Sequence, residues 1–265
     1  LCRTIALCRE CGVKYYLLGN GSNILFEDAG YHGVVIDTTA LKMGIGILEN
    51  VCHPGAAPGE VYDAVAAGAG LKLSALCAAA LENGLTGLEF AYGIPGTVGG
   101  AVYMNAGAYG GEMKQVLRSA AVLFPEEGIR TLSCEELNLS YRHSLLTEHP
   151  EAVVLYAEFE LTSGDPETIR AAMRELMAKR KASQPLEWPS AGSTFKRPEG
   201  YFAGTLIDQT GLKGLTVGGA QVSEKHAGFV INTGNATCAD VQELIRRVQE
   251  AVYRAHGVRL EPEVR

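Results

Sequence analysis

Two glycine-rich stretches leave bare backbone where a ligand rich in hydrogen-bond acceptors could lie. The first is "LGNGSN" (18–23), which follows an apolar run, and the second is "GIPGTVGGAVYMNAGAYG" (93–110). Backbone N–H groups in such loops can bind a pyrophosphate, although a single loop of this kind is more often only a turn. The first loop lacks the GxGxxG spacing of the dinucleotide-binding fold. Two such loops in one chain suggest a large ligand that contains a diphosphate.

Three further segments contain residues that could bind or protonate a substrate. Arg142 lies in "SYRHS", and its guanidinium would suit a carboxylate, although a surface arginine usually pairs with a nearby acid. Ser193 lies beside a glycine in "AGSTFKRP", where most serines only satisfy the backbone of a turn. Glu263 lies near the end in "EPEVR", where a solvated tail residue is the ordinary interpretation. We interpret His226, within an apolar run, as structural.

Cations lie close to two of these segments. The "AKRKASQP" segment contains Lys181 at the end of an expected helix, where positive charge complements the helix dipole without any further function. Lys196 and Arg197 lie just downstream of Ser193 and could supply the positive charge that a weakly acidic hydroxyl needs.

The patterns around these segments predict alternating helices and strands. We expect helices over 4–11, 73–84, 165–183 and 238–256, with Asp165 as an N-cap, Pro166 in the first turn and Gly257 as a C-terminal stop. A shorter helical piece is expected near 202–210. Strands are expected over 13–19, 33–38, 43–51, 120–124 and 152–161, and a turn over 53–59. The run 60–70 fits helix and strand equally well.

Composition limits the class of protein. The chain has 265 residues, 47% of them hydrophobic and 20% charged, which is typical of a folded protein with a large core. A net charge of −7 argues against a general nucleic-acid binder, and no apolar run is long enough to span a bilayer. Leu1 opens the chain inside a helical pattern, so we expect the sequence to be a piece of a longer protein.

The seven cysteines favour free thiols in a reducing compartment over a disulfide framework. Cys8 and Cys11 form one CxxC, but neither a second CxxC nor a suitably spaced histidine pair completes a metal site, and none is expected.

The order of motifs resembles that of a known family. "LGNGSNIL", "GLEFAYGIPGTVGGAVYMNAGAYG", "SYRHS", "PSAGSTFKRP", "GGAQVSEKHAGFVIN" and "LEPEVR" occur in the same order in the UDP-N-acetylenolpyruvoylglucosamine reductases, over nearly the whole chain. A tyrosine-bearing insertion of one branch is lacking ahead of "PSAGS", so the shorter, second type is the better match. The family implies an α+β fold: an FAD-binding domain of the vanillyl-alcohol-oxidase (PCMH) type made of two subdomains, here 1–182 with its N-terminal part missing, and a smaller α+β substrate-binding domain, here 183–265.

The resemblance also implies an activity and a set of functional residues. The family reduces an enolpyruvyl ether in peptidoglycan precursor synthesis, using FAD and NADPH, in the cytoplasm, and we expect a monomer. By resemblance Arg142 faces the substrate carboxylate, Ser193 donates a proton and Glu263 is catalytic. The expected substrate-binding residues are Tyr141, Lys181, Lys196 and Arg197. The expected FAD-binding residues are Gly19, Asn20, Gly21, Ser22, Asn23, Gly93, Ile94, Pro95, Gly96, Thr97, Gly99, Gly100, Ala101, Asn105 and Gly107.

Two rival functions stay open on the sequence. One is an FAD-linked oxidase of the same fold, which does not require Arg142, Ser193 and Glu263 together. The other is an inactive protein that binds a nucleotide sugar, which would carry no flavin and oxidise no NADPH.

Overall fold

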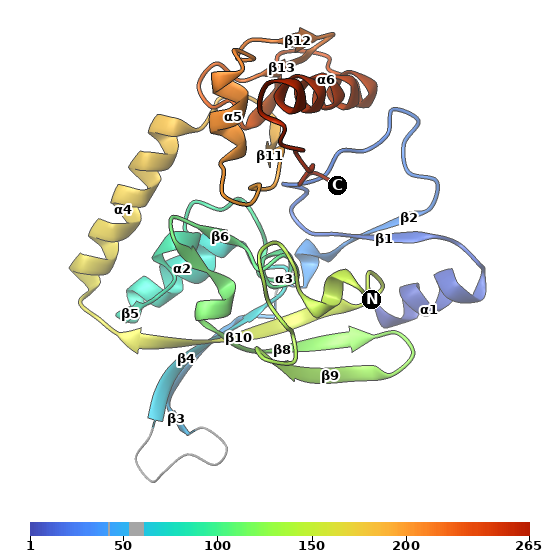
Figure 1. Cartoon of the computed structure of the whole chain (residues 1–265). Coiled ribbons are helices and arrows are strands. Elements are labelled where there is room, and N and C mark those ends of the chain that lie inside the picture. Colours follow the sequence, from blue (N-terminus) through green and yellow to red (C-terminus); the bar gives the residue numbers. More distant parts are fainter. Residues whose placement is uncertain (42, 53–60) are drawn as a thin grey trace. The chain divides into compact units, whose positions relative to one another are not determined.

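The computed structural model describes residues 1–41, 43–52 and 61–265, and the chain divides into two compact units (Figure 1). One unit comprises 1–20 and 33–178, and the other comprises 21–32 and 179–265. The first glycine loop is therefore shared, with its last three residues in the second unit. The functional division into 1–182 and 183–265 stays a prediction, and the turn expected over 53–59 lies outside the described residues.

An antiparallel sheet forms the centre of the first unit. Its strand order is β3–β4–β10–β8–β9, with β5 paired to β10. Within the run 60–70, Val61–Gly68 forms a strand because neighbours pair with it on both sides, and the buried Val65 and Ala67 pair with Phe159 and Ala157 of β10. The strands are β3 (Ile45–Cys52), β4 (Val61–Gly68), β5 (Leu85–Thr86), β8 (Leu117–Phe124), β9 (Gly128–Ser133) and β10 (Val153–Ser163).

Helices α2 (Leu73–Glu82) and α3 (Val98–Tyr103) lie over the same face of this sheet (Figure 1). Helix α2 was expected, and it ends where Gly84 adopts the left-handed φ of 64°. Helix α3 was not expected, because its glycines give no apolar period. It forms because Thr97 caps it, and because Gly99 leaves room for Ala69: a Cβ on Gly99 would lie 3.0 Å from the Ala69 Cβ.

Short elements complete the first unit. Helix α1 (Cys2–Glu10) packs Ile5 against Leu123 and Val153 of the sheet. The expected strands at 13–19 and 33–38 are confirmed as the parallel pair β1 (Tyr15–Leu18) and β2 (Val34–Asp37), and β6 (Gly107–Ala108) pairs with β7 (Gly111–Glu112).

Helix α4 (Pro166–Ser183) contains the boundary between the two units. The predicted cap is confirmed: the Asp165 carboxylate accepts bonds from the backbone N–H and the hydroxyl of Thr168, at 2.9 and 2.7 Å, and Pro166 occupies the first helical position.

The second unit consists of a four-stranded sheet and two helices. Leu244, Val248 and Val252 of the last helix are fully buried against Ala220 and Val222 of the sheet. The strand order is β11–β14–β13–β12, and all pairs are antiparallel. The elements are β11 (Ser190–Ser193), α5 (Ala203–Gln209), β12 (Thr216–Val217), β13 (Ala220–Val222), β14 (Phe229–Asn232) and α6 (Cys238–His256).

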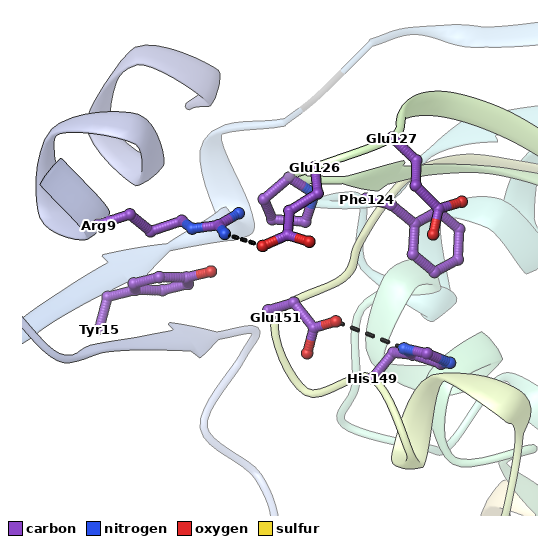
Figure 2. Close-up of a pocket in the computed structure, with 8 residues that line it drawn as sticks. Arg9, Tyr15, Phe124, Glu126, Glu127, His149 and Glu151 are labelled. Carbon is purple, nitrogen blue, oxygen red and sulfur yellow. Dashed lines mark hydrogen bonds and ion pairs between the residues drawn. The ribbon is translucent and has the colours of Figure 1, made fainter.

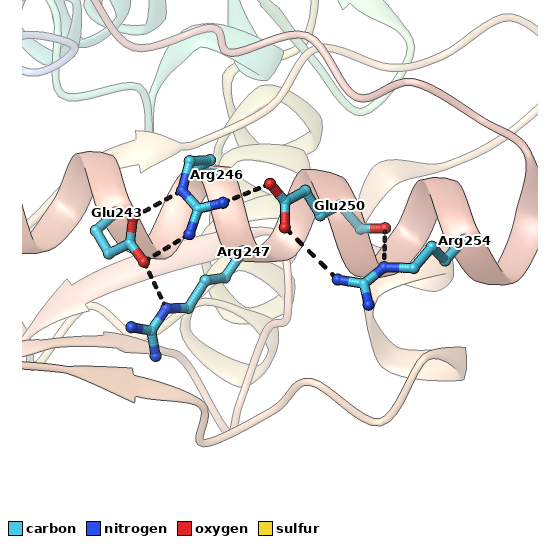
Figure 3. Close-up of polar contacts among 5 residues, drawn as sticks. All are labelled: Glu243, Arg246, Arg247, Glu250 and Arg254. Carbon is cyan, nitrogen blue, oxygen red and sulfur yellow. Dashed lines mark hydrogen bonds and ion pairs between the residues drawn. The ribbon is translucent and has the colours of Figure 1, made fainter.

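The outer face of α6 carries a ladder of ion pairs, shown in Figure 3. Glu243 accepts bonds from Arg246 and Arg247 at 2.8 Å, and Glu250 pairs with Arg246 and Arg254. The hydrogen bonds from Arg246 and Arg247 lower the pKa of Glu243 to about 2. Glu243 therefore keeps its negative charge at all but strongly acidic pH.

The first turn of α6 is capped from two directions. Thr237 and Asp240 form a capping box, in which the Thr237 hydroxyl accepts from the Asp240 N–H at 3.0 Å. Asp28, which is distant in sequence, accepts from the N–H groups of Cys238 and Ala239 at 2.7 and 3.1 Å. Residues 21–32 are thereby fixed to the second unit.

We expect Asp28→Ala to lower the free energy of unfolding by about 1–2 kcal/mol, because two helix N-terminal donors lose a charged acceptor. Denaturant titration measures the loss. Glu27→Ala, which removes the neighbouring exposed acid, is the control and should cost less than about 0.5 kcal/mol. Equal losses in both variants would mean that the cap contributes nothing specific.

Candidate functional site

In the first unit, the start of the first glycine loop contacts the second glycine-rich stretch. The Asn20 carboxamide donates to the Pro95 carbonyl at 2.7 Å. Gly19 faces Thr97 so closely that a Cβ at position 19 would lie 3.0 Å from the Thr97 Oγ1. The two segments that the sequence predicted to share one ligand are therefore in contact.

Part of that backbone is used by the protein itself. The N–H groups of Val98 and Gly99 donate to Leu71 and Ala69 carbonyls at 2.9 and 2.8 Å, and Gly100 donates to the Thr97 hydroxyl at 3.3 Å. The glycines at the start of α3 therefore serve close packing, and the stretch offers a ligand small side chains more than free N–H groups.

Arg142 lies at the tip of a tight turn in the first unit. Ser140 and His143 exchange two backbone hydrogen bonds of 3.1 Å, which leaves Tyr141 and Arg142 as the two central residues. Arg142 has a φ of 56°, in the left-handed region that such a turn normally fills with glycine. Its guanidinium lies over the Tyr141 ring, 5.1 Å from the centroid.

Both ends of this turn are fixed to the end of α3. Asn105, which is 1% exposed, donates to the Ser140 carbonyl at 3.0 Å. The hydroxyl of Ser144, which is fully buried, donates to the Tyr103 carbonyl at 2.7 Å. Although Arg142 lies in a loop, hydrogen bonds on both sides of it hold its turn in place.

In the second unit, Ser193 ends strand β11 at an irregularity in the pairing. The register of β11 against β14 shifts between Ser190 and Ser193, and Gly192 adopts a φ of 78° that favours glycine. Bulges of this kind redirect a side chain. Thr194, which is 4% exposed, fixes the next position by donating to the Gly228 carbonyl at 2.8 Å and accepting from the Val230 N–H at 3.0 Å.

Glu263 lies directly beside this strand end. Its N–H donates to the Thr194 carbonyl at 2.8 Å, and its carbonyl accepts from the Asn23 carboxamide at 3.1 Å. Leu25 and Arg265 continue the pairing, since the Leu25 N–H donates to the Arg265 carbonyl at 2.7 Å. The backbone of Glu263 thus links the end of the first glycine loop to the strand of Ser193.

The other predicted residues have diverse surroundings. Lys196 pairs with Glu261 at 3.1 Å, and Arg197 lies over the Phe202 ring at 4.7 Å. Lys181 is exposed on the last turn of α4. His226 is half-buried and accepts from the Gly228 N–H at 3.1 Å, and burial lowers its pKa. These contacts agree with the structural interpretation of this histidine.

Three of the remaining predicted cofactor-binding residues lie near the segments described above, two in the second unit and one in the first. Ser22 in the second unit faces the turn of Gly192, where a Cβ would lie 3.7 Å from the Ser22 carbonyl oxygen. Gly21 adopts a φ of 66°. In the first unit, Gly107 pairs with Glu112 in the β6–β7 hairpin, which follows Asn105 directly.

A pocket of about 320 Å³ lies elsewhere in the first unit and contains none of the predicted residues (Figure 2). Its acids pair locally, Glu126 with Arg9 and Glu151 with His149. The pocket is lined by Arg9, Tyr15, Phe124, Pro125, Glu126, Glu127, His149 and Glu151. Across the residues that the structure describes, no group of three or more His, Cys, Asp or Glu is placed to hold a metal ion.

Six cysteines within the described ranges are free thiols, and Cys8 of the CxxC is buried in α1. Burial raises the pKa of Cys77 to about 12, so this thiol is protonated at neutral pH.

No helix in the described part of the chain has the length and apolar character needed to cross a membrane.

Sequence reasoning missed three residues that hold the site in place: Asp28, Thr194 and Ser144. Their partners are distant in sequence, so no local pattern reveals them. Thr237 is different, because its Thr-x-x-Asp spacing at the start of an amphipathic helix is a capping-box signal that the sequence did contain.

Comparison with known proteins covers both parts of the chain. Residues 1–133 match the FAD binding domain family, and residues 184–265 match the C-terminal domain family of UDP-N-acetylenolpyruvoylglucosamine reductase. The protein of that name from Agathobacter rectalis is 51% identical over 263 residues, 99% of this chain and 83% of that protein. One from Clostridium perfringens is 50% identical over 262 residues, 99% of this chain and 81% of that protein. The crystal structure of the reductase from Thermus caldophilus is 37% identical, with a TM-score of 0.78, and the match covers 98% of this chain and 87% of that one.

Proposed function

Because the chain belongs to the UDP-N-acetylenolpyruvoylglucosamine reductase family, we propose that it reduces UDP-N-acetylglucosamine enolpyruvate to UDP-N-acetylmuramate with electrons from NADPH. It is an FAD-dependent oxidoreductase of peptidoglycan precursor synthesis, with an α+β fold that combines an FAD-binding domain of the vanillyl-alcohol-oxidase type and the family's C-terminal domain. The geometric observation that carries the proposal is the direct backbone bond between Glu263 and the residue after Ser193.

FAD is held in this proposal by the two glycine segments, Gly19–Asn23 and the stretch 93–107. When bound, FAD supplies the hydride that NADPH provides. The proposed contacts in the first unit are Gly19, Asn20, Gly93, Ile94, Pro95, Gly96, Thr97, Gly99, Gly100, Ala101 and Gly107. Those in the second unit are Gly21, Ser22 and Asn23. Contact between Asn20 and Pro95 supports a shared ligand.

The substrate's carboxylate is held by Arg142, whose planar guanidinium can donate two parallel hydrogen bonds to it. Hydride addition to the terminal carbon of the double bond leaves negative charge that spreads into this carboxylate. A preorganised cation stabilises that charge best, and the rigid turn supplies such preorganisation. Glu263 orients or polarises the reacting group.

Ser193 donates its proton to the carbon next to the one that receives the hydride, which completes the reduction. A serine hydroxyl is a very weak acid, so neighbouring positive charge must stabilise the alkoxide that forms. Lys196 and Arg197, three and four residues further along the chain, are the proposed source of that charge. Tyr141, Lys181, Lys196 and Arg197 are the proposed contacts of the anionic UDP-sugar. We place this monomeric enzyme in the cytoplasm.

An anaerobic titration tests the function. NADPH should remove the visible flavin absorbance of the purified protein, and UDP-N-acetylglucosamine enolpyruvate should then restore it. Loss without restoration would indicate an electron acceptor of another kind, as in an FAD-linked oxidase. A protein that binds the UDP-sugar but carries no flavin would be the inactive binding protein.

A further inference from the structure

We infer that Asn105 is a positioning residue for Arg142, and that its side chain acts on the substrate through the turn at Ser140–His143. The inference rests on the proposed role of Arg142 at the substrate carboxylate. It departs from the sequence-based expectation that the Asn105 side chain binds the cofactor.

The carboxamide of Asn105 has little capacity left for a ligand. Its nitrogen donates to the Ser140 carbonyl and to the Glu112 carboxylate, both at 3.0 Å, and its oxygen accepts from the Lys114 N–H at 2.9 Å. Both donor hydrogens are thus used, and the side chain is 1% exposed. Protein groups use both donor hydrogens, so the side chain has no donor left to offer a cofactor.

The position of Asn105 in the chain suits this arrangement. Its φ is 45°, in the left-handed region, where asparagine is tolerated far better than most residues. That backbone turns the chain sharply after α3 and directs the carboxamide toward Ser140, which is 35 residues later. A bond of such long range fixes the turn to the helix instead of stabilising the local loop.

Arg142 needs this support because its own backbone is strained. Its φ of 56° is the conformation that glycine normally supplies. Residues in such conformations persist only where surrounding contacts hold them in place. The Asn105 bond to Ser140 and the Ser144 bond to Tyr103 supply these contacts on either side of Arg142.

Asn105→Asp is the sharpest test. Aspartate keeps the shape and tolerates the left-handed backbone, but it replaces both donors with an acceptor that faces the Ser140 carbonyl and the Glu112 carboxylate. We expect kcat/KM for the enolpyruvyl substrate to fall about 10²-fold, as for a misplaced catalytic group. The KM and the calorimetric Kd of that substrate should rise, while the flavin content and the rate of flavin reduction by NADPH stay at the level of the unmodified protein.

Asn138→Asp is the matched control. Asn138 is also left-handed, with a φ of 47°, lies in the same unit and is exposed, so this change should leave every readout unaltered. If Asn105→Asp does not fold, Asn105→Gly removes the same bonds while keeping the left-handed backbone, and the same readouts apply.

The double variant Asn105→Asp with Arg142→Ala tests whether Asn105 acts by positioning Arg142 or in some other way. If Asn105 acts through Arg142, then Asn105→Asp should cause no further loss of substrate turnover once the guanidinium is absent. Independent, multiplicative losses would overturn the inference, as would a loss of flavin from Asn105→Asp. Full turnover in the Arg142→Ala single variant would instead overturn the proposed role of Arg142.

Discussion

Ser193→Ala is expected to leave flavin reduction by NADPH intact and to slow turnover of the enolpyruvyl substrate by about 10²–10⁴-fold, the usual cost of removing a general acid. The reason is that only the second half-reaction requires a proton on carbon. The change should not disturb the backbone, because Gly192 and Thr194 on either side fix the bulge. Stopped-flow absorbance of the flavin measures the two half-reactions separately.

Ser190→Ala is the control for this experiment, since Ser190 begins the same strand and is exposed. It should leave both rates unchanged. If Ser193→Ala reoxidises with substrate at the original rate, another group donates the proton. If it loses flavin or NADPH reduction as well, the serine is needed for folding or cofactor binding, and its assignment as an acid is wrong.

Local chemistry made most of the elements predictable. Asp165 and Pro166 together specify a helix start, and the structure confirms it. Gly257, with a φ of 71°, ends α6 as expected. The run 60–70 could not be assigned, because its alanines and valines fit the periodicity of a helix as well as that of a strand. Only the pairing of β4 with β3 and β10 determines that it contains a strand.

Tertiary contacts explain what the sequence did not predict. Helix α3 depends on the fit of Gly99 against Ala69, which a sequence pattern does not contain. The inclusion of residues 21–32 in the second unit depends on Asp28, whose partners lie 210 and 211 residues away. Secondary-structure propensity and hydrophobic periodicity depend on residues that are close in sequence. They therefore do not predict contacts between residues so far apart.

In the candidate site, too, the sequence identified some features and only the structure revealed others. Motif order identified Arg142, Ser193 and Glu263 as candidates, and the structure brings Glu263 beside the strand of Ser193. The hydrogen-bond partners that hold each of them were not predictable. Asn105 illustrates the difference: its residue type suggested a ligand contact, whereas its surroundings in the fold occupy both of its donors.

Two substitutions of Arg142 are expected to separate its chemistry from its backbone strain. Arg142→Gly and Arg142→Ala both remove the guanidinium, so both should lower substrate turnover by about 10²–10³-fold, as for the loss of a charge-stabilising donor. They differ in the backbone, since alanine keeps the strained left-handed conformation while glycine adopts it freely. We therefore expect the glycine variant to be more stable than the alanine variant by about 1 kcal/mol, measured by denaturant titration.

The same pair of changes at Asn138, where φ is 47°, calibrates the strain at a position without a proposed catalytic role. There the glycine variant should again be the more stable one, with activity unchanged. Equal stability of the two Arg142 variants would mean that the turn relaxes and stores no strain, and full turnover in either would remove the guanidinium from the mechanism. A glycine variant that is inactive yet no less stable than the original protein would mean that folding does not require arginine at this position. Substrate binding is then the reason for an arginine where the backbone favours glycine.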